Sequence, residues 1–212
     1  MKIRKVFTLI ELLVTIAIIA ILASMLLPSL QKAKAKAKQT VCASQQKQVG
    51  YLILSYANDY SGYAPSVNDG YNWGQILDLR CGLVQNRNIF VCPSWYPFKF
   101  SPADSTGYFY IYGMKPKDGF AYNGKCFNLF RTENETGNFS PSNFFLLADS
   151  YQDMPPNQTQ CGVVFIHASH IDKIHLRHSK QANMWFADGS VRGVNRDSMT
   201  GYGVTDLGQA SY

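Results

Sequence analysis

The first hydrophobic pattern along the chain is a long, unbroken apolar run. It extends from Phe7 to Leu27 and contains a single charged residue, Glu11. A helix of about 20 apolar residues crosses the ~30 Å hydrocarbon core of a bilayer. The run also follows directly on a short basic head that contains Lys2, Arg4 and Lys5. We therefore predict a transmembrane helix over residues 7–27.

The helical pattern continues beyond Pro28, where the helix can bend. Residues 31–48 are rich in Lys, Ala and Gln, which are good helix formers. The pattern predicts one long helix over 7–57, whose extramembrane amphipathic half, 28–57, docks one stripe onto a domain. The segment Asn58–Gly62 contains the residue types that end a helix. The apolar residues of that stripe recur at roughly helical spacing: Val41, Val49, Leu52, Ile53 and Tyr56.

Beyond residue 58, short aromatic runs alternate with Gly, Pro, Asn and Asp, which predicts short strands and loops. Asp188 and Gly189 are predicted to form the two-residue turn of a tight hairpin. The expected fold class is α+β, with a long N-terminal transmembrane helix packed on a C-terminal globular domain (58–212) of antiparallel β-sheet and long loops. The predicted strands are Tyr108–Tyr112, Phe144–Ala148, Val163–Ile166, Ala182–Ala187 and Ser190–Val194.

Glu11 is out of place in a membrane segment. A carboxylate there costs roughly 2.5–3.5 kcal/mol on insertion scales, so it needs a partner. A secretory signal explains the segment poorly, because its apolar region is usually about 7–15 residues long and ends at a small-x-small site. From the residues alone, a plain N-terminal anchor in which Glu11 reaches back to the headgroups stays open.

The segment Phe7–Glu11, together with Ala17–Ala23 and Pro28, resembles the processing site of type IV prepilins and type II secretion pseudopilins. The resemblance implies that a prepilin peptidase/methyltransferase removes a leader peptide, 1–6, by cutting between Val6 and Phe7, and methylates the new amino terminus. The family usually has Gly before the cut, where this chain has Val6. This departure from the family pattern concerns the efficiency of cleavage.

The same resemblance implies a role for Glu11 in assembly. The new amine at Phe7 is a cation in the same apolar layer, and a neighbouring protomer can pair it with the carboxylate, so that the charge is compensated on assembly. The implied partners are membrane lipid and other pilin-like subunits. The implied location is the inner membrane, single-pass, with the C-terminal domain in the periplasm or at the cell surface.

A second resemblance lies in the predicted hairpin. His178, nine intervening residues, and then Asp188 and Gly189 resemble the H-X9-DG pattern of a group of prepilin-like proteins. The next position is often His in that group and is Ser190 here, so any His-based chemistry at that position is absent.

The formal net charge of +6 does not indicate nucleic-acid binding. The excess of Lys and Arg lies in residues 1–58, while 59–212 is close to neutral. Because nucleic-acid binding needs a basic face with interleaved aromatic residues, we expect no nucleic-acid partner.

The five cysteines leave their pairing open, because spacing does not determine connectivity. The pilin resemblance implies a disulfide between Cys42 and Cys92, which would join the helix to the domain in an oxidising compartment. Buried free thiols are the alternative. The remaining cysteines are Cys81, Cys126 and Cys161.

The histidines and the loop carboxylates are the candidates for metal binding. Clustered imidazoles can bind zinc or copper, and four histidines fall close together, but they lack cysteine partners at metal-ligand spacing. We predict no metal site, and we expect His178 to hydrogen-bond the Asp188 turn. Calcium is the weaker alternative for scattered carboxylates that match no ligand loop. The histidines are His167, His170, His175 and His178, and the carboxylates are Asp149, Asp153, Asp188 and Asp206.

Two functions follow from these patterns. The first is a pseudopilin-like structural subunit of a type II secretion or type IV pilus-like filament. The second is a membrane-tethered module that binds a polysaccharide or surface partner through exposed aromatic residues, although burial in the core is the expected role of those residues. An enzyme is not expected, because the sequence contains no P-loop, G-x-S-x-G or H-E-x-x-H motif. The aromatic candidates are Trp73, Trp95, Tyr96 and Tyr108.

Overall fold

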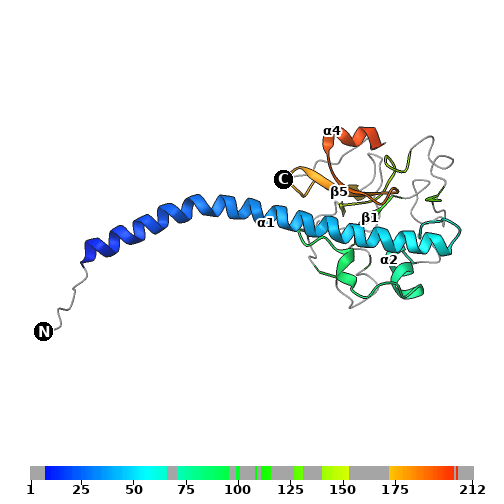
Figure 1. Ribbon diagram of the computed structural model, residues 1–212, viewed down its shortest axis with the longest axis horizontal. Coiled ribbons are helices and arrows are strands. Elements are labelled where there is room, and N and C mark those ends of the chain that lie inside the picture. The colour runs from blue at the N-terminus through cyan, green and yellow to red at the C-terminus, as the bar shows by residue number, and fades with distance from the viewer. Residues whose placement is uncertain are drawn as a thin grey trace. The chain divides into compact units, whose positions relative to one another are not determined.

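The computed structural model describes residues 8–65, 71–95, 99–100, 108, 111–115, 127–130, 140–152, 172–202 and 204 (Figure 1). The chain forms two compact units, Met1–Ala37 and Lys38–Tyr212. The helix α1 contributes residues to both units, and every buried residue identified in the structure lies in the second.

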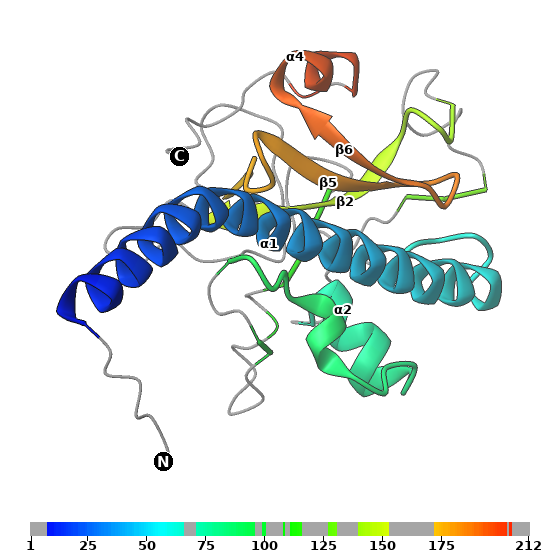
Figure 2. The same ribbon diagram turned by 60° about the vertical axis from the view of Figure 1, so that its left-hand side comes forward.

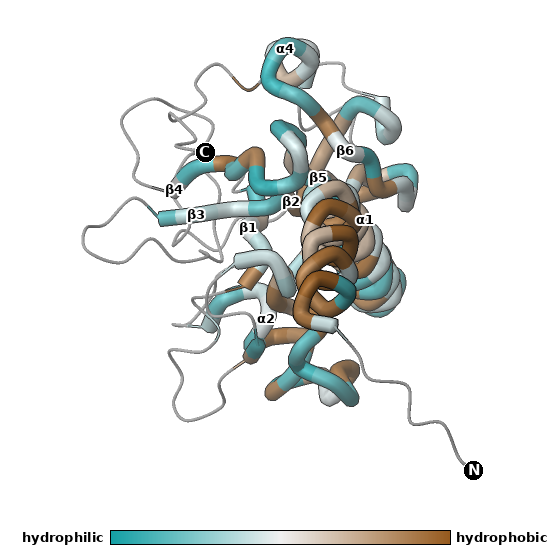
Figure 3. The backbone as a smooth tube through the Cα atoms, turned by 90° about the vertical axis from the view of Figure 1, so that its left-hand side faces the viewer, coloured by the Kyte–Doolittle hydropathy of each residue, from teal (hydrophilic) through white to brown (hydrophobic). Residues whose placement is uncertain are grey.

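Helix α1 (Leu9–Asp59) confirms the predicted long helix and continues through Pro28. Figure 3 shows the mostly hydrophobic colouring of its N-terminal half. At its C-terminal end Ser61 adopts a positive φ of 54°, and the Gly62 N–H donates to the Ala57 carbonyl at 2.7 Å. A left-handed residue followed by this backward bond is a common way for a helix to end.

The second unit contains an antiparallel sheet of four strands in the order β1-β2-β5-β6 (Figure 2). A smaller antiparallel sheet pairs β3 with β4. The α+β fold class with an antiparallel sheet is therefore confirmed. The strands are β1 (Gly113–Met114), β2 (Phe145–Ala148), β3 (Ser150–Gln152), β4 (Asp172–Ile174), β5 (Gln181–Phe186) and β6 (Val191–Asn195).

Three of the predicted strands match β2, β5 and β6 closely, and one does not. Tyr112 precedes a two-residue strand, β1, instead of ending a longer one. The predicted strand Val163–Ile166 lies outside the described residues.

The hairpin between β5 and β6 differs from the predicted two-residue turn. Phe186 N–H donates to Ser190 O at 2.9 Å, and Gly189 N–H donates to Phe186 O at 2.9 Å, so the loop has one more residue than predicted. Only Gly189 has a positive φ, 82°, whereas a two-residue turn of the predicted type needs two such residues. The Asp188-Gly189 sequence is therefore also compatible with a longer turn in which only the glycine is left-handed.

The C-terminal part of α1 packs on β5. Gly50 makes this possible, because a Cβ at that position would lie 2.1 Å from Trp185 Nε1. Val49 and Ile53 are fully buried on the same face, but the exposed Val41 does not belong to it, contrary to the predicted stripe. Two polar residues complete the buried face: Gln39 and Gln46.

An aromatic core includes residues of the short helices that follow α1. Trp73 packs edge-on against Phe90 with ring centroids 5.4 Å apart, and Tyr108 is buried nearby. Trp73 and Tyr108 are therefore core residues, as expected, while Trp95 is only half-buried and Tyr96 lies outside the described residues. The short helices are α2 (Trp73–Gln75), the π-helix η1 (Ile76–Arg80), the 3₁₀ helix η2 (Arg87–Phe90), α4 (Arg196–Met199) and the 3₁₀ helix η4 (Thr200–Tyr202).

Candidate functional site

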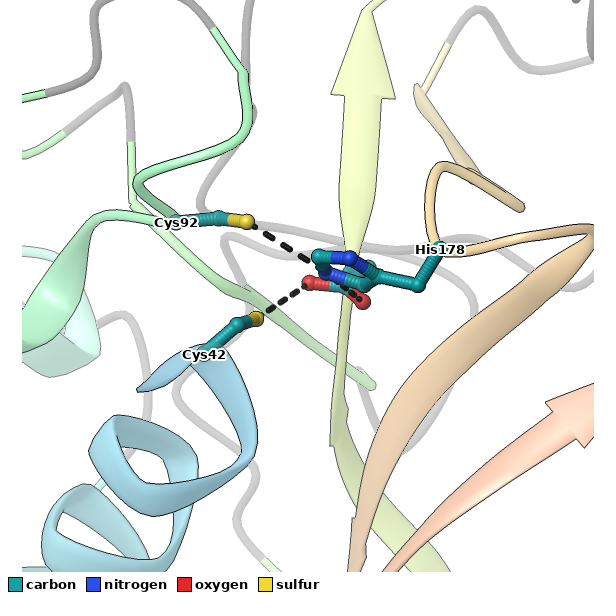
Figure 4. A group of neighbouring side chains, drawn as sticks. Cys42, Cys92 and His178 are labelled. Atoms are coloured by element: carbon teal, nitrogen blue, oxygen red, sulfur yellow. Dashed lines mark hydrogen bonds and ion pairs between the residues drawn. The ribbon is translucent and has the colours of Figure 1, made fainter. Parts of the chain in front are cut away.

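Four chemically reactive side chains meet inside the second unit. Cys42 comes from α1, Cys92 from the segment after η2, Asp149 from the junction of β2 and β3, and His178 from the turn that leads into β5. Figure 4 shows Cys42, Cys92 and His178 converging from three separate parts of the chain. The four residues are between 0% and 3% exposed, so the site is closed to bulk water.

The ligand-type atoms of these residues all lie within 4.8 Å of one another. Cys42 Sγ lies 3.2 Å from Asp149 Oδ1. His178 Nε2 lies 3.5 Å from Cys92 Sγ and 3.4 Å from Asp149 Oδ2. These distances place two sulfur atoms, one nitrogen and one carboxylate around a common centre.

Neighbouring groups hold the cluster in place. The Asn183 backbone N–H donates to Asp149 Oδ2 at 2.7 Å, and the Gln46 amide donates to Oδ1 at 3.3 Å. Tyr112 O–H lies 3.3 Å from Cys42 Sγ, where it can donate to the sulfur. Because each of these partners is itself buried, the carboxylate and the thiol are held in fixed positions.

The electrostatics of Cys92 and His178 favour their charged forms. Burial raises the pKa of the Cys92 thiol, but hydrogen bonds with Cys42 and His178 and the charge of Arg177 outweigh it, so the pKa falls well below its ordinary value. Burial lowers the pKa of His178, but the hydrogen bond to Cys92 and the negative charges of Asp149 and Cys92 raise it by more. The contact between the Cys92 thiol and the His178 imidazole contributes to both shifts.

The pKa shifts of Cys42 and Asp149 favour the neutral forms of these two groups. Burial raises the pKa of Cys42 well above its ordinary value, and the hydrogen bond to Cys92 and the charge of Asp149 add to the shift. Burial likewise raises the pKa of Asp149, as does the charge of Cys92, although Arg177 and His178 oppose them. Three acidic groups in a dry site cannot all ionise without a compensating cation.

The arrangement does not match a Cys-His-Asp catalytic set. In such a set the carboxylate binds one ring nitrogen of the histidine, while the other nitrogen takes the proton of the nucleophile. Here the same nitrogen, His178 Nε2, faces both Cys92 and Asp149. Burial also keeps a substrate from the thiol, so the geometry indicates convergence on one point instead of proton relay.

A second candidate site lies at the start of α1. Glu11 Oε2 accepts hydrogen bonds from the Thr8 N–H at 2.8 Å and the Thr8 hydroxyl at 2.9 Å. Thr8 Oγ1 in turn accepts from the Glu11 N–H at 3.2 Å. This reciprocal pair is a capping box, which satisfies donors that the first turn of a helix leaves unpaired. The Glu11 carboxylate therefore has a partner within its own helix.

The segment that follows is long and apolar enough to cross a membrane, and none of its most apolar stretch is buried within the chain. Leu9, Ile10 and Leu13, for example, are all exposed. Exposed apolar side chains on a helix need an apolar environment, which either lipid or other helices can supply.

Comparison with known proteins assigns this segment. Residues 5–27 match the prokaryotic N-terminal methylation motif. The motif, which is of the prepilin type, implies a pilin-like subunit that is processed by a prepilin peptidase, and pilin-like proteins are typically structural. No curated protein and no solved structure matches the chain.

The prepilin-type motif covers Val6, Phe7 and Glu11 but does not reach the hairpin. Val6 and Phe7 lie outside the described residues, so the cleavage position stays a prediction. The H-X9-DG assignment of His178, Asp188 and Gly189 also stays a prediction. Together, the motif and the apolar helix indicate a membrane-anchored or secreted pilin-like protein.

The prediction that His178 hydrogen-bonds the Asp188 turn is wrong. The Asp188 carboxylate accepts from Ser190 N–H at 2.9 Å, while His178 Nε2 faces the buried cluster. The adjacent His175 packs against Trp95 and Tyr151, with ring centroids 4.3 and 4.9 Å apart, and burial and the charge of Arg177 lower its pKa to about 3. His167 and His170 lie outside the described residues.

The remaining ligand predictions have mixed outcomes. Cys42 and Cys92 are both present as thiols, so the disulfide implied by the pilin resemblance stays a prediction. Asp149 lies among sulfur and nitrogen atoms instead of the oxygen ligands that calcium needs, and Asp188 is exposed on the hairpin. Four further candidates lie outside the described residues: Cys126, Cys161, Asp153 and Asp206.

Sequence reasoning missed the cluster as a set because its members are far apart along the chain. It named each of the four residues, but in three separate roles: a disulfide, a calcium ligand and a turn contact. Two features of the sequence could have indicated the cluster. The pilin resemblance implies that Cys42 and Cys92 lie close together, and His178 precedes a predicted buried strand.

Proposed function

We propose that this chain is a pseudopilin-like structural subunit of a type II secretion or type IV pilus-like filament. In this proposal a prepilin peptidase cuts between Val6 and Phe7, methylates the new amine, and releases the subunit for assembly. The observation that supports it most directly is a single carboxylate, Glu11, at the start of an exposed apolar helix that carries the methylation motif.

The exposed helix supports assembly because none of its most apolar stretch is buried among the described residues. Its apolar residues lie in lipid before assembly and against other subunits' helices afterwards. Glu11 then exchanges its capping contact with Thr8 for the ammonium of a neighbouring protomer. A buried charge is tolerable when it is paired and hydrogen-bonded, and costly when it is alone.

Mass spectrometry of the N-terminus tests the processing step. We expect the chain, expressed with a functional prepilin peptidase, to begin with N-methylated Phe7. The matched variant Val6→Gly restores the residue that usually precedes the cut and should be processed at least as completely. An intact Met1 in both proteins would contradict the proposal and favour a permanently tethered module, whereas processing of Val6→Gly alone would show that Val6 blocks maturation.

A further inference from the structure

We propose that Cys42, Cys92, Asp149 and His178 form a structural metal site whose preferred ion is Zn²⁺. The set contains two thiols, an imidazole and a carboxylate, which are the side chains that bind zinc in proteins. The proposal concerns the second unit only, so it stands independently of the filament function.

The distances fit a tetrahedral ion. Zinc bonds of about 2.0–2.3 Å correspond to ligand-to-ligand edges of about 3.3–3.8 Å in a tetrahedron. The observed separations are 3.2 Å from Cys42 Sγ to Asp149 Oδ1, 3.5 Å from Cys92 Sγ to His178 Nε2 and 3.4 Å from His178 Nε2 to Asp149 Oδ2. One ligand atom from each of the four residues lies within 4.8 Å of the other three. An ion can therefore enter among these atoms with small adjustments of the side chains.

The direction of the histidine supports the same conclusion. Nε2 of His178 faces a sulfur and a carboxylate oxygen at once, which a hydrogen bond from one N–H satisfies only partly. A metal ion at the centre is bound by all of them through lone pairs. On binding, Cys42 releases its thiol proton and the Cys92–His178 pair releases the one proton that it holds, so both sulfurs bind as thiolates and the imidazole binds as the neutral form.

The surroundings resemble the outer shell of a metal site. Hydrogen bonds from Asn183 and Gln46 orient the carboxylate of Asp149, and Tyr112 lies within reach of the Cys42 sulfur. Such outer contacts fix the ligands and tune the site. Two thiolates and a carboxylate exceed the charge of Zn²⁺ by one, and the cation that acts on Cys92 and Asp149 is Arg177.

The site is structural instead of catalytic. All four ligands come from the protein and are buried, so no position is open to a substrate. The ion would join α1 to the loop after η2, to the end of β2 and to the turn before β5. It would do so with the same two cysteines as the predicted disulfide, so a chain molecule can contain one or the other.

Metal analysis of the full chain, purified in detergent under reducing conditions, tests the proposal. We expect one equivalent of zinc, with a dissociation constant below about 0.1 μM, as for structural zinc sites. Cobalt should replace it and give both tetrahedral d–d bands and thiolate-to-cobalt charge-transfer bands. These measurements use the parent chain, so they do not depend on the folding of any variant.

Variants then identify the ligands. Cys92→Ser and His178→Gln should weaken zinc binding by more than about 100-fold, since loss of an outer-shell contact alone costs 10–100-fold. Cys81→Ser and His175→Gln are the matched controls, because neither residue belongs to the cluster, and they should bind as the parent does. Near-ultraviolet circular dichroism checks that each variant is folded.

Three results would overturn the proposal. The first is a parent chain that binds zinc more weakly than about 0.1 mM, far from a structural site. The second is cobalt bound without thiolate charge-transfer bands. The third is a Cys42–Cys92 disulfide in protein isolated from its native host without reductant. None of these results affects N-terminal processing, so a failed metal site and a failed filament function are distinguishable.

Discussion

At the scale of single residues, Glu11 has two separable properties. Its carboxylate accepts the Thr8 N–H and hydroxyl and so caps α1, and its negative charge is available for a neighbouring amine. The sequence predicted the charge but not the capping contact, although Thr8 and Glu11 have the spacing of a capping box.

The two properties can be separated by substitution. Glu11→Gln retains the capping contact, because Gln also serves at this position of a capping box, but it removes the charge. We expect normal membrane retention and at least an approximately tenfold loss of filament incorporation, since a neighbour's ammonium would be buried without a counter-charge. Thr8→Ala removes the capping partner and keeps the charge, at a cost of about 1 kcal/mol in the helix.

Incorporation of Thr8→Ala should therefore stay close to that of the parent chain. Both variants are measured by quantifying the subunit in sheared filaments relative to the subunit in membranes. The reverse pattern, with Glu11→Gln incorporated and Thr8→Ala excluded, would show that Glu11 acts as a helix cap and not as a charge partner.

At the scale of elements, periodicity predicted α1 and three strands but not the face that α1 buries. That face includes Gln39 and Gln46, which a hydrophobic pattern predicts to be exposed to water. Gln46 is buried because its amide donates to Asp149 and to the Asn183 carbonyl, at 3.3 and 3.1 Å. Such partners lie more than 100 positions away along the chain, and no local pattern contains them.

Lys115 lies directly after β1, beside the pairing of β1 and β2, and its amine is partly buried. The backbone N–H of Lys115 donates to Leu146 O at 2.9 Å. Burial lowers the pKa of the side-chain amine from 10.5 to about 8. Between pH 8 and 10.5 the unfolded chain therefore binds this proton more tightly than the folded chain. Below about pH 8, the folded chain bears the full cost of burying the charged amine. The free energy of unfolding should therefore rise as the pH increases from about 8 to 10.5.

Urea unfolding of the parent and Lys115→Met at pH 7.5, 8.5 and 9.5, in the same detergent, measures this effect. We expect the variant's advantage to be largest at the lowest pH and to shrink as the pH rises. Lys47→Met, at an exposed position, is the matched control and should leave the pH dependence of the parent unchanged. An advantage of Lys115→Met that stays constant with pH would contradict the assignment.

At the scale of the whole molecule, the sequence predicted the fold class because a long apolar run, an amphipathic continuation and alternating strands are each local signals. It did not predict the buried cluster, since Cys42, Cys92, Asp149 and His178 are far apart along the chain and come together only in the tertiary structure. The hairpin shows the same limit on a smaller scale. Asp188 and Gly189 predicted a turn, but the loop length depends on the register of β5 and β6.

The division into two units predicts that the second can fold without the apolar segment. Every buried residue identified in the structure lies at or after Gln39. We therefore expect a chain that begins at Lys32 to stay in solution without detergent and to keep the near-ultraviolet circular dichroism and urea midpoint of the full chain. A chain that begins at Val49 is the matched control, because it also lacks Gln39, Cys42 and Gln46.

The Val49 chain should lose its tertiary signal. Without the Gln46 amide, Asp149 keeps a buried carboxylate with one donor fewer, and an unsatisfied buried group costs roughly 1–3 kcal/mol or more when charged. The loss of Cys42 removes a further contact to the same carboxylate. If the Lys32 chain instead aggregated while the full chain stayed folded in detergent, the apolar segment would be part of the folding unit. If both truncated chains folded equally well, residues 39–48 of α1 would be dispensable for the core of the second unit.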